Sequence, residues 1–288
     1  FYTPPGGAPV FVPGMHWLSV VVSGLKGVPV LAKQQWWTSR GEQASDRAQV
    51  SRQVLERCAT AWGPRVVHVF DRGFANGPWL GALLSHSLLF VMRWKTQYHL
   101  QDAQGKRPAW HMTRGKRSHS HRLIDDVRRR CQRKTGMVFV PVTHPDYPDV
   151  PLTLVVSRPG KGRTPWYLLT NLPILTPDDA WSGIFIYARR WQIELTFRFA
   201  KTELAMESPR LWAWDNRLKL LAMVSLVYAF LLSLWASSPH DLSDWLLRAF
   251  CPRTGKRHRE VAMPLYRLRL ALSRLWLSYP DPIPYLFN

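Results

Sequence analysis

The chain has 288 residues, a formal net charge of +20 at pH 7 and a hydrophobic content of 46%, with 15 tryptophans. This composition excludes a disordered protein and is sufficient for one large domain or two ordinary ones. The strong positive charge favours a polyanionic partner, either nucleic acid or an anionic membrane surface.

The first third of the chain predicts alternating strands and helices. In chain order these are strands at 15–23 and 27–36 joined by a glycine-bounded turn, a helix at 44–62, a buried strand at 66–70, a helix from Asn76 to Ser85 and a strand at 87–94. This order is that of a ribonuclease H-like fold without its first strand. Because the chain lacks an initiator methionine, we expect a fragment whose missing first strand lies upstream of Phe1.

Residues 95–173 differ in character and predict a β-rich insertion with a basic loop. Strand-like runs cover 137–144, 151–158 and 165–172, and the arginines and lysines of 128–134 are expected on a short helix. Charge runs of this kind are often only solvated surface. Interleaved aromatic residues favour contact with nucleic acid instead, and these are Trp94, Trp110 and Trp166.

The last part of the chain predicts helices. They cover 177–206, 217–236, 241–250 and 261–277. The apolar run 220–236 has the minimum length for a membrane span, and its flanking charges favour a buried core helix instead. The three cysteines match no zinc-binding spacing, so we expect unpaired thiols in a reducing cytoplasm.

One helix face in the run 187–204 combines groups that suit work on phosphates. Tyr187, Arg190, Glu194 and Lys201 are spaced so that they fall within an arc of roughly 60° on a continuous helix, and Arg198 joins them. The carboxylate suits a metal ion, while the cations and the hydroxyl suit phosphates beside it. The alternative is a solvated helix whose i,i+4 ion pairs each contribute a few tenths of a kcal/mol.

Asp71 is the second candidate carboxylate, in the run VVHVFDRGFA. It follows a predicted strand, and the carboxyl ends of strands are where open α/β sheets bind ligands. The alternative is an Asp that caps the following turn or helix. Asp71 and Glu194 together offer oxygen ligands for Mg²⁺ or Mn²⁺, and a pair of such ions supports in-line displacement at a phosphodiester.

The motifs FDRGF and Y-x2-R-x3-E-x6-K together resemble the DDE-type transposases of bacterial insertion sequences. More narrowly, they are similar to the branch with the Tyr–Arg–Glu–Lys signature, which also has a β-rich insertion between the two motifs. The resemblance implies an α/β fold with a ribonuclease H-like mixed sheet flanked by helices. It also implies catalytic and metal-binding roles for Asp71 and Glu194, with Mg²⁺ or Mn²⁺ as the cofactor in a two-metal site.

The resemblance further implies DNA-binding roles. Tyr187, Arg190 and Lys201 match residues that hold phosphates around the cleaved strand, and Arg198 lies on the same predicted face. Trp166 matches a residue that stacks on a base flipped out beside the cut, although a core position is its rival explanation. Double-stranded DNA is the implied partner, bound by a homodimer in a synaptic complex, without a membrane. The implied location is the bacterial cytoplasm, at the nucleoid.

The resemblance also assigns a role to each part of the chain. These parts are the N-terminal part of the catalytic core at 1–94, the basic β-rich insertion at 95–173, the C-terminal helices of the core at 174–236 and a basic helical tail at 237–288.

One catalytic residue of the family has no match in the sequence. The first catalytic Asp belongs on the first strand, and no Asp or Glu precedes Glu42. We therefore expect DNA binding with little or no cleavage by these residues alone. Two alternatives stay open, namely an inactive transposase remnant that only binds DNA and a basic membrane-associated protein with 220–236 inserted.

Overall fold

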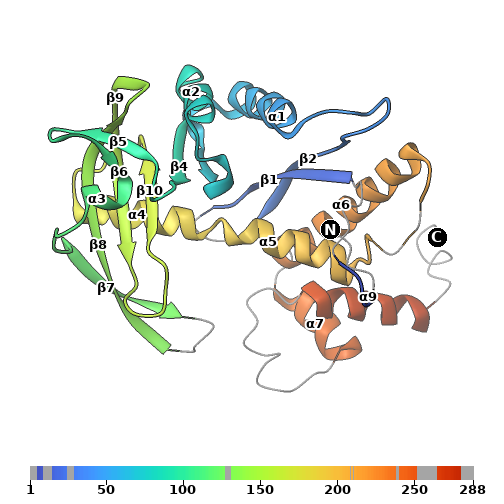
Figure 1. Ribbon diagram of the computed structural model, residues 1–288. Helices are drawn as coiled ribbons and strands as arrows, with labels where there is room; N and C mark the ends of the chain where they lie inside the picture. The colour runs from blue at the N-terminus through green and yellow to red at the C-terminus, as the bar shows by residue number, and fades with distance from the viewer. Residues whose placement is uncertain are drawn as a thin grey trace. The chain divides into compact units, whose positions relative to one another are not determined.

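A computed structural model describes residues 5–8, 15–24, 29–126, 131–207, 209, 211–237, 240–251 and 265–279 (Figure 1). The chain forms two compact units. Ser45–Arg190 form one of them, called here the sheet unit. Phe1–Ala44 and Trp191–Asn288 form the other, called here the hairpin unit.

The sheet unit alternates helices and strands in its first half and is mainly β in its second. Its helices are α1 (Arg47–Trp62), α2 (Gly77–Ser85), α3 (Ala109–Met112) and α4 (Pro177–Ala188), with short 3₁₀ turns η1 (Gly63–Arg65) and η2 (Arg72–Phe74). Its strands are β3 (Val67–Phe70), β4 (Leu89–Arg93), β5 (His99–Asp102), β6 (Gly105–Pro108), β7 (Ser120–Asp126), β8 (Cys131–His144), β9 (Tyr147–Arg158) and β10 (Trp166–Thr170).

These strands form one mixed sheet in the order β3-β4-β10-β9-β8-β5-β6, with β7 also paired to β8. Only the pair β3–β4 is parallel, and α2 connects its two strands. The remaining pairs are antiparallel. Because β10 pairs with β4, the strands of the predicted insertion continue the same sheet as the strands before it.

Helices cover both faces of this sheet, because successive side chains on its central strands point to opposite sides. On β4, Phe90 and Met92 join a core with α1 and α2, whereas Val91 joins a core with α4. Figure 1 shows α4 crossing the strands of the sheet, with α2 beside β4 and α1 next to α2. The predicted mixed sheet flanked by helices is therefore confirmed.

Most predicted elements of the sheet unit are confirmed, with two corrections. The strand β3 is only half-buried, because all four of its residues keep part of their surface exposed. Arg133 and Lys134 lie on β8 and not on a helix, because the antiparallel pairing with β7 extends along them. The rest of that predicted helix, 128–130, lies outside the described residues.

The hairpin unit joins the predicted N-terminal hairpin to the C-terminal helices. Its elements are β1 (Met15–Val22), β2 (Val30–Thr38), α5 (Trp191–Arg198), the π-helical turn η3 (Phe199–Glu203), α6 (Trp214–Ser237), α7 (His240–Phe250) and α9 (Leu265–Ser278). The antiparallel pairing of β1 with β2 confirms the hairpin. These two strands form a sheet of their own. The ribonuclease H-like arrangement stays a prediction, as do the four domain boundaries.

Aromatic and hydroxyl contacts hold the hairpin unit together. Trp17 of β1 meets Phe197 of α5 edge to face, with ring centroids 4.6 Å apart. Thr196 of α5 and Tyr228 of α6 share a buried hydrogen bond of 3.0 Å between their hydroxyl groups. Burial raises the pKa of Tyr228, so this hydroxyl stays neutral at physiological pH. Both contacts fix α5, the helix that carries Glu194.

The apolar helix α6 is exposed along one side, which corrects the prediction of a buried core helix. Leu221, Val224 and Tyr228 belong to the core, whereas Met223 and Leu226 are 65% and 70% exposed. Among the described residues, the neighbouring elements cover one stripe of the helix and leave its other side exposed. Trp214–Ala236 is long and apolar enough to cross a membrane, by length and composition alone.

Candidate active-site residues

Asp71 lies where β3 ends, at the carboxyl edge of the parallel pair. Its side chain is exposed, and its Oδ1 accepts a hydrogen bond of 2.7 Å from the backbone N–H of Gly73. The residue therefore caps the turn η2 as the structural alternative predicted. An exposed carboxylate held at a strand end by one hydrogen bond is also suitable as a metal ligand, so the two readings are compatible.

Arg47, at the start of α1, lies beside Asp71. Its Nη2 and the Oδ1 of Asp71 are 3.2 and 3.0 Å from the same point, the position that a Cβ on Gly73 would occupy. A side chain at position 73 would therefore crowd both groups. The absence of a side chain at Gly73 allows a cation and a carboxylate to share one small area of the surface.

Tyr187, Trp166 and Arg190 form one cluster in the sheet unit. The ring of Tyr187 meets that of Trp166 edge to face at 5.1 Å, and the guanidinium of Arg190 lies 5.8 Å from the Tyr187 ring centroid. Tyr187 is only 2% exposed, and its hydroxyl has no hydrogen-bond partner among the described residues. Trp166 is half-buried, so part of its indole is in the core and part reaches the surface.

The predicted continuous helix over 177–206 is interrupted, which corrects that prediction, while the shared face of its site residues stays a prediction. The helix α4 ends at Ala188, and the N–H of Arg190 bonds the carbonyl of Tyr187 at 3.0 Å, a tighter turn than an α-helix. A new helix, α5, starts at Trp191 and passes into the π-helical turn η3. The sequence argument assumed a rotation of 100° per residue along one continuous helix. It therefore does not apply between Tyr187 and the residues of the motif that follow the interruption.

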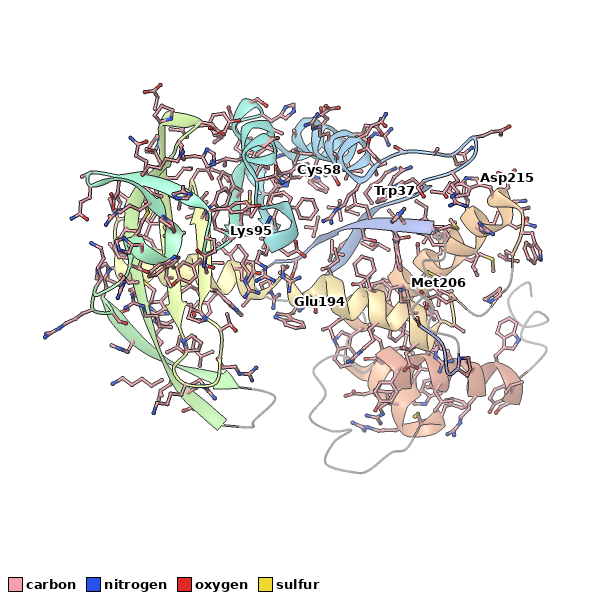
Figure 2. The ribbon with its side chains drawn as sticks, in the orientation of Figure 1. Trp37, Cys58, Lys95, Glu194, Met206 and Asp215 are labelled. Carbon is pink, nitrogen blue, oxygen red and sulfur yellow. The ribbon has the colours of Figure 1, made fainter. Side chains whose placement is uncertain are left out.

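Glu194, Arg198 and Lys201 belong to the hairpin unit. Glu194 is half-buried in the first turn of α5 (Figure 2), and Arg198 is exposed in its last turn. Lys201 lies on η3 and forms an exposed ion pair of 2.6 Å with Glu207. Exposed pairs contribute only about 0–1 kcal/mol, so Lys201 can exchange this carboxylate for a phosphate at little cost.

The predicted site residues are thus divided between the two units. The sheet unit holds Asp71 and the cluster of Trp166, Tyr187 and Arg190, and the hairpin unit holds Glu194, Arg198 and Lys201. Within the described part of the chain, no three His, Cys, Asp or Glu side chains gather as a metal cluster. Cys58 and Cys251 are buried free thiols, as the sequence predicted. The side chain of Cys131 is not among those that the structure describes.

The aromatic residues predicted to contact nucleic acid have different environments. Trp94 is 1% exposed and packs edge to face against Tyr98 and His144 in the core, so it cannot stack on a base. Trp110 is half-buried under the guanidinium of Arg114, 5.7 Å from its ring. The prediction that Trp94 contacts nucleic acid is therefore wrong. Trp94 directly follows β4 and belongs to the hydrophobic core.

The sequence alone did not identify a pocket at the start of α1. Arg47, Ser51 and Arg52 line it from one side, and most of the residues in the range 73–79 line it from the other. The spacing i, i+4, i+5 on the predicted helix is the only signal for the first three. Nothing in the sequence indicates that residues 73–79 lie opposite them.

The sequence matches the family model described as the transposase DDE domain over residues 40–230. This range covers more than half of the chain and includes Asp71, Tyr187, Glu194 and Lys201. It also spans the sheet described above and the start of the C-terminal helices. The chain therefore belongs to the family of transposases with a DDE domain.

Proposed function

We propose that the chain is a cut-and-paste DNA transposase of the Tyr–Arg–Glu–Lys branch. It hydrolyses phosphodiester bonds at the ends of a mobile element and joins the freed 3′ hydroxyls to target DNA. The family match over residues 40–230, which contains Asp71 and Glu194, is the observation that supports this most. The net charge of +20 supports DNA as the partner and predicts salt-sensitive binding.

Asp71 and Glu194 are the residues that we assign as ligands of Mg²⁺ or Mn²⁺. Both offer carboxylate oxygens, which hard divalent ions prefer, and one Asp71 oxygen already has a fixed position through Gly73. A bound pair of such ions supplies activation of water or a DNA hydroxyl and stabilisation of the leaving 3′ oxygen. Arg190, Arg198 and Lys201 hold DNA phosphates on either side.

Replacement of either carboxylate is expected to weaken metal binding. We expect Asp71→Asn and Glu194→Gln each to raise the Kd for Mn²⁺ by about tenfold or more, because an amide loses the charge that attracts the ion. Electron paramagnetic resonance of free Mn²⁺ in a titration measures this Kd directly. The assay needs no cleavage, so it tests the ligands separately from activity.

Two other acidic residues provide matched controls for this experiment. Asp149 is exposed in the sheet unit and Glu207 is exposed in the hairpin unit, and neither belongs to the proposed site. Asp149→Asn and Glu207→Gln should leave the Kd for Mn²⁺ within about twofold of wild type, since neither removes a ligand. If Asp71→Asn and Glu194→Gln behave like these controls, the metal assignment is wrong.

An inactive DNA-binding protein is the second candidate function. No acidic residue precedes Glu42, and the carboxylate of Asp46 caps α1 by accepting a hydrogen bond of 2.8 Å from the N–H of Gln49. These 288 residues thus supply two of the three carboxylates that the family resemblance implies. If the chain has this second function, it binds DNA without cutting it. Mg²⁺-dependent cleavage that Glu194→Gln abolishes would contradict this expectation and support activity of the chain itself.

Tyr187→Phe is expected to change stability and DNA affinity in opposite directions. The buried Tyr187 hydroxyl has no partner among the described residues, so its removal should stabilise the sheet unit by up to about 1 kcal/mol. If this hydroxyl holds a phosphate in the complex, the same change should weaken DNA binding by about threefold or more. Chemical denaturation and fluorescence anisotropy measure the two effects. Unchanged DNA affinity would assign Tyr187 to the core alone.

The remaining features of the family are part of the same proposal. We assign the active form to a homodimer in a synaptic complex with double-stranded DNA, in the bacterial cytoplasm at the nucleoid. Trp166 would stack on a base extruded beside the cut, with the exposed part of its indole. Fractionation of expressed protein separates this proposal from the membrane alternative, which requires α6 to remain in the membrane pellet.

A further inference from the structure

We propose that the pocket between α1 and α2 binds a phosphate group of the DNA strand next to the scissile phosphate. The pocket lies entirely in the sheet unit and has a volume of about 250 Å³, enough for a phosphate with part of its sugar. Its lining includes Arg47, Ser51 and Arg52 from α1 and Phe74, Asn76 and Trp79 from the opposite side. This inference rests on the proposed function, because it takes Asp71 as the neighbouring reaction centre.

The pocket has two exposed guanidinium groups that form no ion pair among the described residues, although that of Arg47 lies beside the Asp71 carboxylate. No ion pair joins Arg47 or Arg52 to a carboxylate among the described residues, and both side chains are exposed. The Arg47 guanidinium lies over the Phe74 ring, 4.9 Å from its centroid, which restricts its orientation before any ligand arrives. An arginine restricted in this way loses less entropy when it binds a phosphate.

Two buried hydrogen-bond donors in the lining are without acceptors. Ser51 is 4% exposed and Trp79 is 8% exposed, and both line the pocket. Neither the Ser51 hydroxyl nor the Trp79 indole N–H has a hydrogen-bond partner among the described residues. Unpaired buried donors are rare because each costs about 1–3 kcal/mol. A phosphate would supply an acceptor for the Ser51 hydroxyl after rotation about its Cα–Cβ bond, whereas the Trp79 indole is held by its ring contacts with Phe70 and Phe74.

The N-terminus of α2 adds to the positive potential, whereas the Asp46 carboxylate that caps α1 offsets the positive end of that helix. The pocket is lined by residues from the first turns of α1 and α2, which are 16 and 9 residues long. The N-terminus of an α-helix carries a partial positive charge and favours anions. Asn76 keeps its side-chain oxygen on the N–H of Trp79 at 2.8 Å, so its amide group is held at the pocket wall.

The position of the pocket links it to the reaction centre. Arg47 lines the pocket, and its guanidinium and the Asp71 carboxylate lie within 3.2 Å of the same point above Gly73. Adjacent phosphates of one strand are about 3.4 Å apart along the helix axis, and the helical path of the backbone makes their separation roughly 6–7 Å. A strand whose scissile phosphate lies at Asp71 would therefore place its neighbouring phosphate within reach of Arg47 and Arg52.

DNA binding in the presence of EDTA tests the proposal without requiring metal or cleavage. The probe is a fluorescein-labelled 20-base-pair duplex, and its Kd is measured by anisotropy over a range of NaCl concentrations. We expect Arg47→Gln and Arg52→Gln each to raise the Kd by about five- to tenfold and to reduce the slope of log Kd against log salt by about 1. Unchanged circular dichroism spectra and melting temperatures show that the variants are folded.

Arg57→Gln is the matched control, because Arg57 is exposed on the same helix and does not line the pocket. It removes the same charge and should raise the Kd by less than about twofold. Equal effects of all three substitutions would overturn the proposal, since they would show only a general loss of positive charge. This failure would leave the Mn²⁺ result for Asp71 and Glu194 unaffected, so the two proposals can fail separately.

A second measurement distinguishes a strand phosphate from free phosphate. Ala48 is exposed and lines the pocket, so Ala48→Glu places a negative charge there without disturbing the core. We expect this variant to weaken binding of the duplex by about tenfold or more. If inorganic phosphate raises the melting temperature of wild type but not of Ala48→Glu, while both bind the duplex equally, the pocket binds free phosphate and the DNA assignment is wrong.

Discussion

Trp181→Ala is expected to destabilise the sheet unit by about 3–5 kcal/mol, the usual cost of truncating a buried tryptophan. Trp181 is 1% exposed and fills the core between α4 and the sheet, together with Val91 and Leu168. Its indole N–H donates a hydrogen bond of 2.7 Å to the hydroxyl of Ser120 on β7. The substitution therefore creates a cavity and also removes one of the contacts that join α4 to β7.

The same residue is supported from the solvent side. The Arg122 guanidinium lies 5.5 Å from the Trp181 ring centroid and forms an ion pair of 2.8 Å with Asp178 in the first turn of α4. This ion pair is exposed, so it adds at most about 1 kcal/mol. Burial of the indole therefore determines the size of the effect. Urea denaturation followed by circular dichroism measures the loss of stability.

Two further substitutions separate the causes of this effect. Ser120→Ala leaves the indole in place but removes its acceptor, and it should cost about 1–2 kcal/mol. Trp212→Ala is the control, because Trp212 is 89% exposed and its loss should change stability by less than about 0.5 kcal/mol. A Trp181→Ala effect as small as that of Trp212→Ala would show that α4 is not packed on the sheet as described.

The sequence predicted elements well where a local pattern determines the outcome. Asn76, Gly77 and Pro78 indicate a helix start, and the Asn76 side chain does cap α2. The strand pattern at 151–158 predicts β9, because Leu154 and Val156 face one core while Val155 faces the other. Such patterns depend only on residues close in the chain, so they can be identified without knowledge of the fold.

The sequence did not predict the interruption after α4. Neither glycine nor proline occurs from Ala188 to Trp191, so nothing local marks the change of helix. The boundary between the two compact units falls at the same place, between Arg190 and Trp191. Tertiary packing of each unit, and not helix propensity, therefore explains why a periodic pattern fails here.

Residue type alone also could not separate functional aromatic residues from core residues. Trp94, Trp110 and Trp166 occur in the same basic region, yet the first is buried and the other two are half-buried. The phosphate pocket was missed for a related reason. Arg52 and Trp79 are 27 positions apart in the chain, and only the packing of α1 beside α2 brings them to one cavity. Long-range contacts of this kind leave no local sequence pattern.

Asn171→Ala is expected to cost about 2–4 kcal/mol, because it leaves two buried backbone groups without partners. The Asn171 side-chain N–H donates to the carbonyl of Leu88 at 2.9 Å, and its Oδ1 accepts from the N–H of Phe90 at 2.9 Å. Leu88 and Phe90 are both fully buried. The amide thus continues the hydrogen-bond ladder between β10 and β4 beyond the last paired residue, Thr170.

Hydrogen exchange at the amide of Phe90 provides a local measurement of this effect. In wild type the amide is protected by Asn171, and in Asn171→Ala its exchange should accelerate by about 30-fold or more, which corresponds to about 2 kcal/mol. Asn171→Asp keeps the acceptor for Phe90 but loses the donor to Leu88, so its exchange rate should be intermediate. Asn216→Ala, at an exposed position on α6, is the control and should not change the exchange rate of Phe90.

Equal protection of the Phe90 amide in wild type and Asn171→Ala would show that the β4–β10 ladder holds without the Asn171 side chain. In that case the path from β10 into α4, and with it the position of Tyr187, would depend on the hydrophobic core alone.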